Sequence, residues 1–106
     1  MFDFANLKKF ANLKKIAPMG AAAPAAFAAF KVFDAAALAD GVIPKKYKEL
    51  IALGVALTTQ CGYCLEVHRK AALAAGATPE EISETVFVAA ALRAGAAVTH
   101  GTHLVT

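Results

Sequence analysis

Apolar residues recur along most of the chain at the three- to four-residue spacing of helices. Phe27, Phe30 and Phe33 stand among alanines, and Leu38 follows them. This spacing places the rings along one side of a helix over 25–40, and we predict that they form an aromatic ridge in the protein core. Nowhere do four to eight residues alternate between apolar and polar types with β-branched enrichment, so no strand is predicted.

Proline and glycine mark the expected ends of the first two long helices. Pro24 is placed to be the first residue of the aromatic helix, because the first helical position needs no N–H donor. Asp40-Gly41 is expected to end it, since glycine adopts the left-handed conformation at little cost. Pro44 then opens a predicted helix over 45–57.

A capping box gives the clearest local signal in the chain. Thr78 stands at the expected N-cap, Pro79 at the first helical position and Glu81 at the third. Reciprocal hydrogen bonds between such a threonine and glutamate satisfy two backbone donors that a helix start leaves unpaired. The two remaining predicted helices cover 62–75, which Gly76 ends, and 79–99.

The first 20 residues contain a tandem repeat, in which Phe-Ala-Asn-Leu-Lys-Lys occurs twice over 4–15. Its apolar positions recur every three residues, so the apolar stripe turns by about 60° per step on a helix of 3.6 residues per turn. We predict a short N-terminal helical arm over 1–20, ended by Pro18 and Gly20, that packs against a neighbouring subunit.

These elements predict an all-α protein, a compact helical bundle in a single domain over 1–106 with its core over 24–98. Apolar residues make up 58% of the chain, against typical values of about 45–50%. Such a chain has more hydrophobic surface than a small monomer buries, so we expect a homo-oligomer.

Composition also argues against several partners. The net charge of +3 comes from dispersed lysines rather than a basic cluster, so no nucleic acid is expected. The charge-poor runs 17–30 and 50–67 are interrupted, the second by Glu66, and neither supplies the ~20 apolar residues of a membrane span. No basic and apolar leader opens the sequence, which favours a cytoplasmic protein without a membrane partner.

Both cysteines and one histidine lie close together in the sequence. Cys61, Cys64 and His68 stand at i, i+3 and i+7, so in a helix their side chains share one face. A C-x-x-C pair at a helix start lies near unpaired backbone N–H groups and the positive end of the helix dipole, both of which favour thiolate over thiol. The pair is therefore suited to thiol–disulfide chemistry.

Other roles for these residues remain open at this point. A structural zinc ion needs four ligands, and only Glu49, or His100 or His103 of a predicted frayed tail, could complete the set. Covalent haem attachment is excluded, because Leu65 rather than histidine follows the second cysteine. Two inert buried cysteines are the remaining alternative to a dithiol site.

The spacing supports a specific division of roles. His68 follows Cys64 by one helical turn and can accept its proton, which yields the attacking thiolate. Cys61 can then resolve the product into an intramolecular disulfide. Glu49 could orient the imidazole, but a carboxylate beside an apolar stripe is either a surface group or a buried acid with a purpose.

Glu49, Cys61, Cys64 and His68 together resemble the E-x11-C-x2-C-x3-H signature of the AhpD-like alkylhydroperoxidases, within the carboxymuconolactone decarboxylase family. Further similarity covers 48–53, 69–72 and 76–82. The resemblance implies an all-helical fold, trimers or hexamers, and a cofactor-free dithiol that reduces hydroperoxides. It also implies regeneration by a dithiol donor such as dihydrolipoamide, and a Glu–His–Cys proton relay that includes Glu49.

The sequence departs from that pattern in two respects. Tyr63 stands where some peroxidase members have a second histidine before the second cysteine, and the chain matches the short, single-repeat branch. We expect a dithiol peroxidase or thiol–disulfide oxidoreductase with Cys64 as nucleophile, Cys61 as resolving residue, and His68 and Glu49 as the relay. The alternatives are a redox-sensing or zinc-binding interaction module and a lactone decarboxylase-like enzyme, although the decarboxylase members generally lack the cysteine pair.

Overall fold

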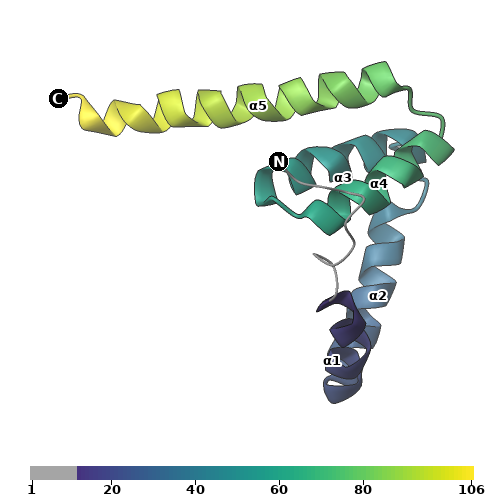
Figure 1. Cartoon of the computed structure of the whole chain (residues 1–106). Helices are drawn as coiled ribbons and strands as arrows, with labels where there is room; N and C mark the ends of the chain where they lie inside the picture. The colour runs from purple at the N-terminus through teal and green to yellow at the C-terminus, as the bar shows by residue number, and fades with distance from the viewer. Residues whose placement is uncertain (1–11) are drawn as a thin grey trace.

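The computed structural model describes residues 12–106, and every regular element in that range is helical. The elements are α1 (Ile16–Ala22), α2 (Pro24–Leu38), α3 (Lys45–Thr59), α4 (Gly62–Ala74), α5 (Pro79–Gly101) and the short 3₁₀ helix η2 (Thr102–Leu104) (Figure 1). The predicted all-α bundle is confirmed. Most of the tandem repeat, residues 4–11, lies outside the described residues.

Helix α3 lies at the centre of the packing, against α4 on one side and α5 on another. The buried core joins Leu53 of α3, Ala72 of α4 and Ala77 of the following turn, and partly buried Leu50, Leu65 and Ile82 pack against it. Figure 1 shows α1 and α2 extending away from this core, and the C-terminal half of α5 projecting past α3 and α4. The core therefore sits where α3, α4 and the start of α5 meet.

Several predicted helix ends are confirmed. Helix α4 ends before Gly76, whose φ of +97° is a left-handed conformation that glycine adopts without a Cβ clash. At the start of α5, the Glu81 N–H donates to Thr78 Oγ1 (3.1 Å) and the Thr78 N–H donates to Glu81 Oε1 (2.9 Å), which completes the predicted capping box.

The prediction that Pro18 and Gly20 end the first segment is wrong, because both lie inside α1. Pro18 occupies the first turn, where backbone N–H groups have no intrahelical acceptor and proline costs little. Gly20 is buried against the ring of Phe27, and a Cβ there would overlap that ring. Glycine therefore serves the close approach of α1 to α2, and the chain bends three residues later, at Ala23.

Two expectations for α2 are also corrected. The helix ends at Leu38, and Gly41 is not left-handed; Asp40 instead accepts a hydrogen bond from the Lys45 N–H (2.6 Å). The aromatic ridge is not core in the single chain, because α2 has no buried residue, and Phe30 and Phe33 are 58% and 69% exposed.

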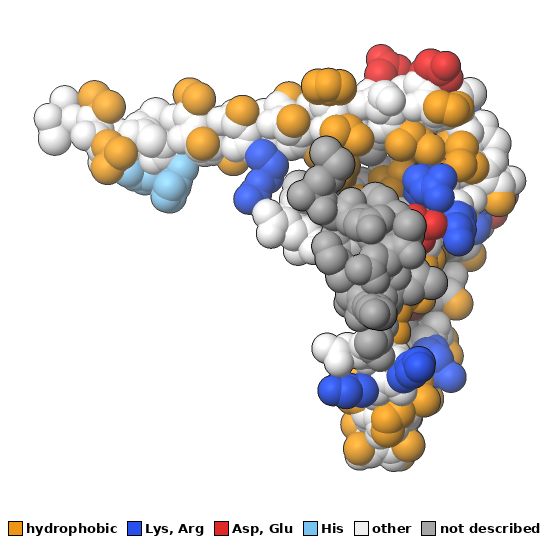
Figure 2. Space-filling model, in the orientation of Figure 1, with side chains coloured by type: hydrophobic (Ala, Val, Ile, Leu, Met, Phe, Trp, Pro, Cys, Tyr) orange, Lys and Arg blue, Asp and Glu red, His pale blue; other side chains and the backbone are white. Residues whose placement is uncertain are grey.

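Helix α5 is longer and more exposed than predicted. It continues through His100, and His103 lies in η2, so the two histidines belong to ordered helix rather than a frayed tail. Figure 2 shows hydrophobic side chains along the length of α5. By length and composition alone, 79–104 could cross a membrane (mean hydropathy 1.3), as could α1 and α2 if that bent pair counts as one span. Glu84 and Arg93 interrupt this stretch, so it contains no long charge-free run.

Candidate dithiol site

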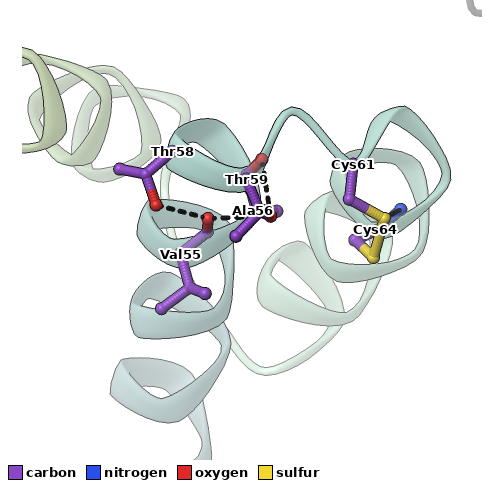
Figure 3. Close-up of a disulfide and its surroundings, with 6 residues drawn as sticks. All are labelled: Val55, Ala56, Thr58, Thr59, Cys61 and Cys64. Atoms are coloured by element: carbon purple, nitrogen blue, oxygen red, sulfur yellow. Dashed lines mark hydrogen bonds between the residues drawn. A yellow bond between two sulfur atoms is a disulfide. The ribbon is translucent and has the colours of Figure 1, made fainter.

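Cys61 and Cys64 form a disulfide at the start of α4, with their Cα atoms 5.2 Å apart (Figure 3). Cys61 is the N-cap residue of the helix, and its Sγ accepts a hydrogen bond from the Cys64 N–H (3.2 Å). The Cys61 sulfur thus takes the place of the oxygen that Ser, Thr, Asp or Asn supplies at this position. Both sulfurs lie in the first turn, where backbone N–H groups and the helix dipole favour negative charge.

The end of α3 holds this dithiol in position. Gln60 adopts a left-handed conformation (φ 58°) and its N–H donates to the Ala56 carbonyl, which the Cys61 N–H also contacts at 3.1 Å. The hydroxyls of Thr58 and Thr59 donate to the Val55 carbonyl at 2.8 and 3.2 Å (Figure 3). The polar run at 58–60 therefore satisfies the carbonyls of the last turn of α3 and directs the chain straight into α4.

Glu49 lies on the face of α3 that packs toward α4, and only 2% of its surface is exposed. Its Oε2 is 2.6 Å from Nδ1 of His68, and its Oε1 accepts a hydrogen bond from the Lys45 ammonium at 2.7 Å. Of the two interpretations left open by the sequence, the structure selects the buried acid. Burial followed from the packing of α3 on α4, which the helix pattern of α3 alone does not determine.

The surroundings of Glu49 keep it ionised. Burial by itself raises the pKa of a carboxyl group, but the hydrogen bonds and charges of Lys45 and His68 outweigh it and hold the pKa of Glu49 below its usual value. An ionised carboxylate only accepts hydrogen bonds, so Nδ1 of His68 is the donor. Nε2 is then the ring nitrogen that carries the lone pair for proton transfer.

Helix geometry relates this pair to the dithiol. His68 follows Cys64 by four residues within α4, so their side chains neighbour one another on one helix face. His68 is about one-fifth exposed and both cysteines are half-buried, which leaves the sulfurs reachable from solvent. The structure thus brings Glu49 to His68 across two helices and places the dithiol one turn before the imidazole.

Between residues 12 and 106, no three His, Cys, Asp or Glu side chains are grouped so as to hold a metal ion. His100 and His103 pair with each other instead, with ring centroids 5.1 Å apart. His100 lies in the last turn of α5 and His103 in η2, whereas the cysteines lie at the start of α4. They do not join the cysteines in a zinc site within the described residues.

Lys45 is the residue of this site that the sequence analysis missed. It stands among other lysines at the start of α3, and its position four residues before Glu49 is the spacing of a helical ion pair. That spacing was the available signal, but most such pairs lie on the surface and contribute little.

Fold and site together define an all-α protein with a dithiol at a helix start and a buried carboxylate–imidazole pair beside it. The chain belongs to the carboxymuconolactone decarboxylase family, whose family model matches residues 24–106. This family includes decarboxylases and AhpD-like peroxidases.

Two known proteins are similar to this chain. "Uncharacterized protein 4 in cox locus" of Paracoccus denitrificans is 48% identical over 71 residues, which are 67% of this chain and 64% of that protein. This chain therefore spans less than two-thirds of the relative's length. The crystal structure of an apo carboxymuconolactone decarboxylase family protein from Legionella pneumophila matches with a TM-score of 0.68 and 32% identity, over 76% of this chain and 71% of that one.

Proposed function

We propose that the protein is a dithiol peroxidase, a thiol–disulfide oxidoreductase that reduces hydroperoxides through Cys61 and Cys64. The observation that supports this most strongly is the buried Glu49–His68 contact of 2.6 Å on the helix that begins with the Cys61–Cys64 pair. A buried ion pair contributes little to stability by itself, so its position next to reducible sulfur favours a role in proton transfer.

The proposed reaction begins with the reduced protein. Nε2 of His68 accepts the proton of the Cys64 thiol, and Glu49 stabilises the resulting imidazolium through Nδ1–H. The Cys64 thiolate attacks the terminal oxygen of the hydroperoxide, so an S–O bond forms while the O–O bond breaks. The alkoxide takes the proton from His68 and leaves as an alcohol, and Cys64 becomes a sulfenic acid.

Cys61 completes the cycle. The Cys61 thiol loses its proton and its sulfur attacks the Cys64 sulfur, so the S–S bond forms while the S–O bond breaks. The departing hydroxide takes up that proton and leaves as water, which gives the disulfide seen in the structure. A dithiol such as dihydrolipoamide then reduces this disulfide by exchange and is itself oxidised. All electrons come from thiols, so the reaction needs no cofactor, and it suits the cytoplasm, where thiols are kept reduced.

Replacing each cysteine in turn tests this proposal. Hydroperoxide consumption with dihydrolipoamide as donor is measured for the wild type, Cys64→Ser and Cys61→Ser, with circular dichroism to check the fold. We expect Cys64→Ser to consume none. Cys61→Ser, reduced and then freed of the donor, should consume about one equivalent without turnover, because it can form the sulfenic acid but has no second cysteine to resolve it. Wild-type turnover by Cys64→Ser would overturn the proposal. A lactone decarboxylase activity would instead survive both substitutions.

A further inference from the structure

The ammonium group of Lys45 connects the relay carboxylate to the end of α2. Its Nζ donates to Glu49 Oε1 at 2.7 Å and to the Leu38 carbonyl at 3.0 Å. The backbone N–H of the same residue donates to Asp40 Oδ1 at 2.6 Å. Lys45 is thus held at its backbone and at its tip by the segment that joins α2 to α3, and its side chain is 45% exposed.

We propose that Lys45 is a positioning residue of the dithiol site: it occupies one oxygen of Glu49, keeps the carboxylate ionised in its buried position, and so leaves the other oxygen to hold the imidazole of His68. The proposal rests on the function proposed above, and it assigns the control of that relay to a residue that contacts neither the imidazole nor the sulfurs.

The physical need for such a group follows from burial. A carboxylate that is 2% exposed loses most of its hydration, and in the absence of a compensating charge it would take up a proton. A protonated Glu49 would no longer require Nδ1 of His68 to be the donor, so the tautomer with the lone pair on Nε2 would lose its advantage. The Lys45 hydrogen bond is the largest of the effects that lower the pKa of Glu49.

Two neighbouring lysines do not share this role. Lys46 pairs with Glu81 of α5 at 3.0 Å. Lys48 donates to the Ala39 carbonyl at 2.6 Å, so it also anchors α3 to the end of α2, but through a carbonyl rather than through Glu49. Lys48 is therefore a matched control, because its removal loosens the same connection without changing the charge beside the buried carboxylate.

The test compares Lys45→Met, Lys45→Arg and Lys48→Met with the wild type. The first readout is a carbon-13 NMR titration of the Glu49 carboxyl group in the oxidised protein. The second is the pH dependence of alkylation of the reduced protein by iodoacetamide, which reports the thiolate. Neither readout requires hydroperoxide turnover.

We expect Lys45→Met to raise the pKa of Glu49, because a hydrogen-bonded opposite charge beside the buried carboxylate is removed. In this variant Glu49 becomes protonated at a higher pH than in the wild type. The part of the alkylation profile in which the rate rises with pH moves to higher pH as a result. Alkylation at acidic pH therefore falls below the wild-type rate, because the imidazole then lacks its ionised partner. Lys45→Arg should retain most of the wild-type behaviour, and Lys48→Met should match the wild type.

Two outcomes contradict the proposal. Unchanged titration in Lys45→Met would show that the cation does not hold Glu49 ionised, and an equal shift in Lys48→Met would assign the effect to the connection between α2 and α3. If Lys45→Met does not fold, Lys45→Gln takes its place with the same expected shift. If the wild type consumes no hydroperoxide while Lys45→Met still raises the pKa of Glu49, only the peroxidase function is contradicted.

Discussion

Each oxygen of the Glu49 carboxylate has a different partner, and this division is the basis of the proposed chemistry. Lys45 takes one oxygen and His68 the other, so neither the acid nor the ring has freedom to rotate. A carboxylate that accepts a hydrogen bond from one ring nitrogen fixes the tautomer of an imidazole and stabilises its charged form. At the level of single residues, we therefore expect the charge of Glu49 to matter as much as its shape.

Glu49→Gln tests this point. A glutamine keeps the size of the side chain but has no charge, and its NH₂ group replaces one of the two oxygens that accept separately from Lys45 and His68. We expect the rate of thiol alkylation and of hydroperoxide reduction at pH 7 to fall by ~10²-fold, the lower range for the loss of positioned acid–base catalysis. Glu80→Gln, which changes an exposed acid on α5, is the control and should leave both rates unchanged. Wild-type rates in Glu49→Gln would remove Glu49 from the relay.

The cysteine and histidine positions could be predicted from sequence because they lie within one helix, where spacing alone fixes which side chains share a face. The partnership of Glu49 with His68 could be suggested from the residues only on the condition that their two helices pack together, and the family resemblance was what favoured it over a surface position for Glu49. Lys45 was missed for the opposite reason: its local spacing was visible, but its importance comes from the burial of the acid it contacts.

At the scale of elements, the capping box sets where α5 begins and links α5 to the site-bearing helix. Thr78 and Glu81 satisfy each other's backbone N–H groups, and Glu81 also pairs with Lys46 of α3. The pKa of Glu81 is held below its usual value by the backbone hydrogen bond from Thr78 and by Lys46. The start of α5 is thereby tied to the helix that carries Glu49.

We expect Thr78→Ala to lower the free energy of unfolding by ~1 kcal/mol, the usual cost of losing an N-cap side chain. Chemical denaturation of both proteins measures the difference. Thr102→Ala serves as control, because the Thr102 hydroxyl only donates to the Thr99 carbonyl at the far, exposed end of α5. Equal losses in the two variants would contradict a special role for the capping box.

The helix boundaries show where local signals are sufficient. Pro24, Pro44, Gly76 and Thr78 each impose a backbone or capping requirement, and helices begin or end beside them. Pro18 and Gly20 misled the prediction because first-turn proline is tolerated and because the glycine serves a tertiary contact with Phe27. The aromatic residues of α2 likewise indicate that one face of this helix packs against another surface. The pattern does not determine whether that surface belongs to the same chain or to another.

At the scale of the whole molecule, the single chain has more surface than its mass requires. Its accessible surface is 7917 Å², whereas a folded monomer of this mass exposes about 5,600 Å². The radius of gyration is 16.8 Å, against about 13 Å for a compact chain of this length. The excess surface is larger than the ~800 Å² per partner of a standard interface, so we propose that the protein is a homo-oligomer, a trimer or hexamer.

A groove between α3 and α5 is one surface that a second copy would cover. It has a volume of about 570 Å³ and is lined by apolar side chains that include Ile51, Val55, Val88 and Leu92. Leu92 is 67% exposed in the single chain. Helix α5 also has the length and composition of a membrane span. Its apolar face could therefore be covered either by another protein surface or by lipid.

Light scattering on the purified protein, without detergent, measures its mass and so tests whether copies of the chain associate in the absence of lipid. We expect the wild type to have several times the 10.9 kDa mass of one chain. Leu92→Glu should shift the mass toward the monomer, because a charge would be buried in the interface. Val42→Glu, at a fully exposed loop position, should leave the mass unchanged. A wild-type monomer at micromolar concentration, or a protein that floats with lipid vesicles, would contradict the oligomer.

The central claim is that Cys64 is the sulfur that meets the hydroperoxide. The most direct measurement is to add one equivalent of hydroperoxide to reduced Cys61→Ser in the presence of dimedone and to locate the adduct by mass spectrometry. The account predicts a sulfenic-acid adduct on Cys64 in nearly every chain, because the residue that would resolve it is missing. An unmodified Cys64 under these conditions, with the adduct found on Cys61 in the reciprocal Cys64→Ser variant, would contradict it.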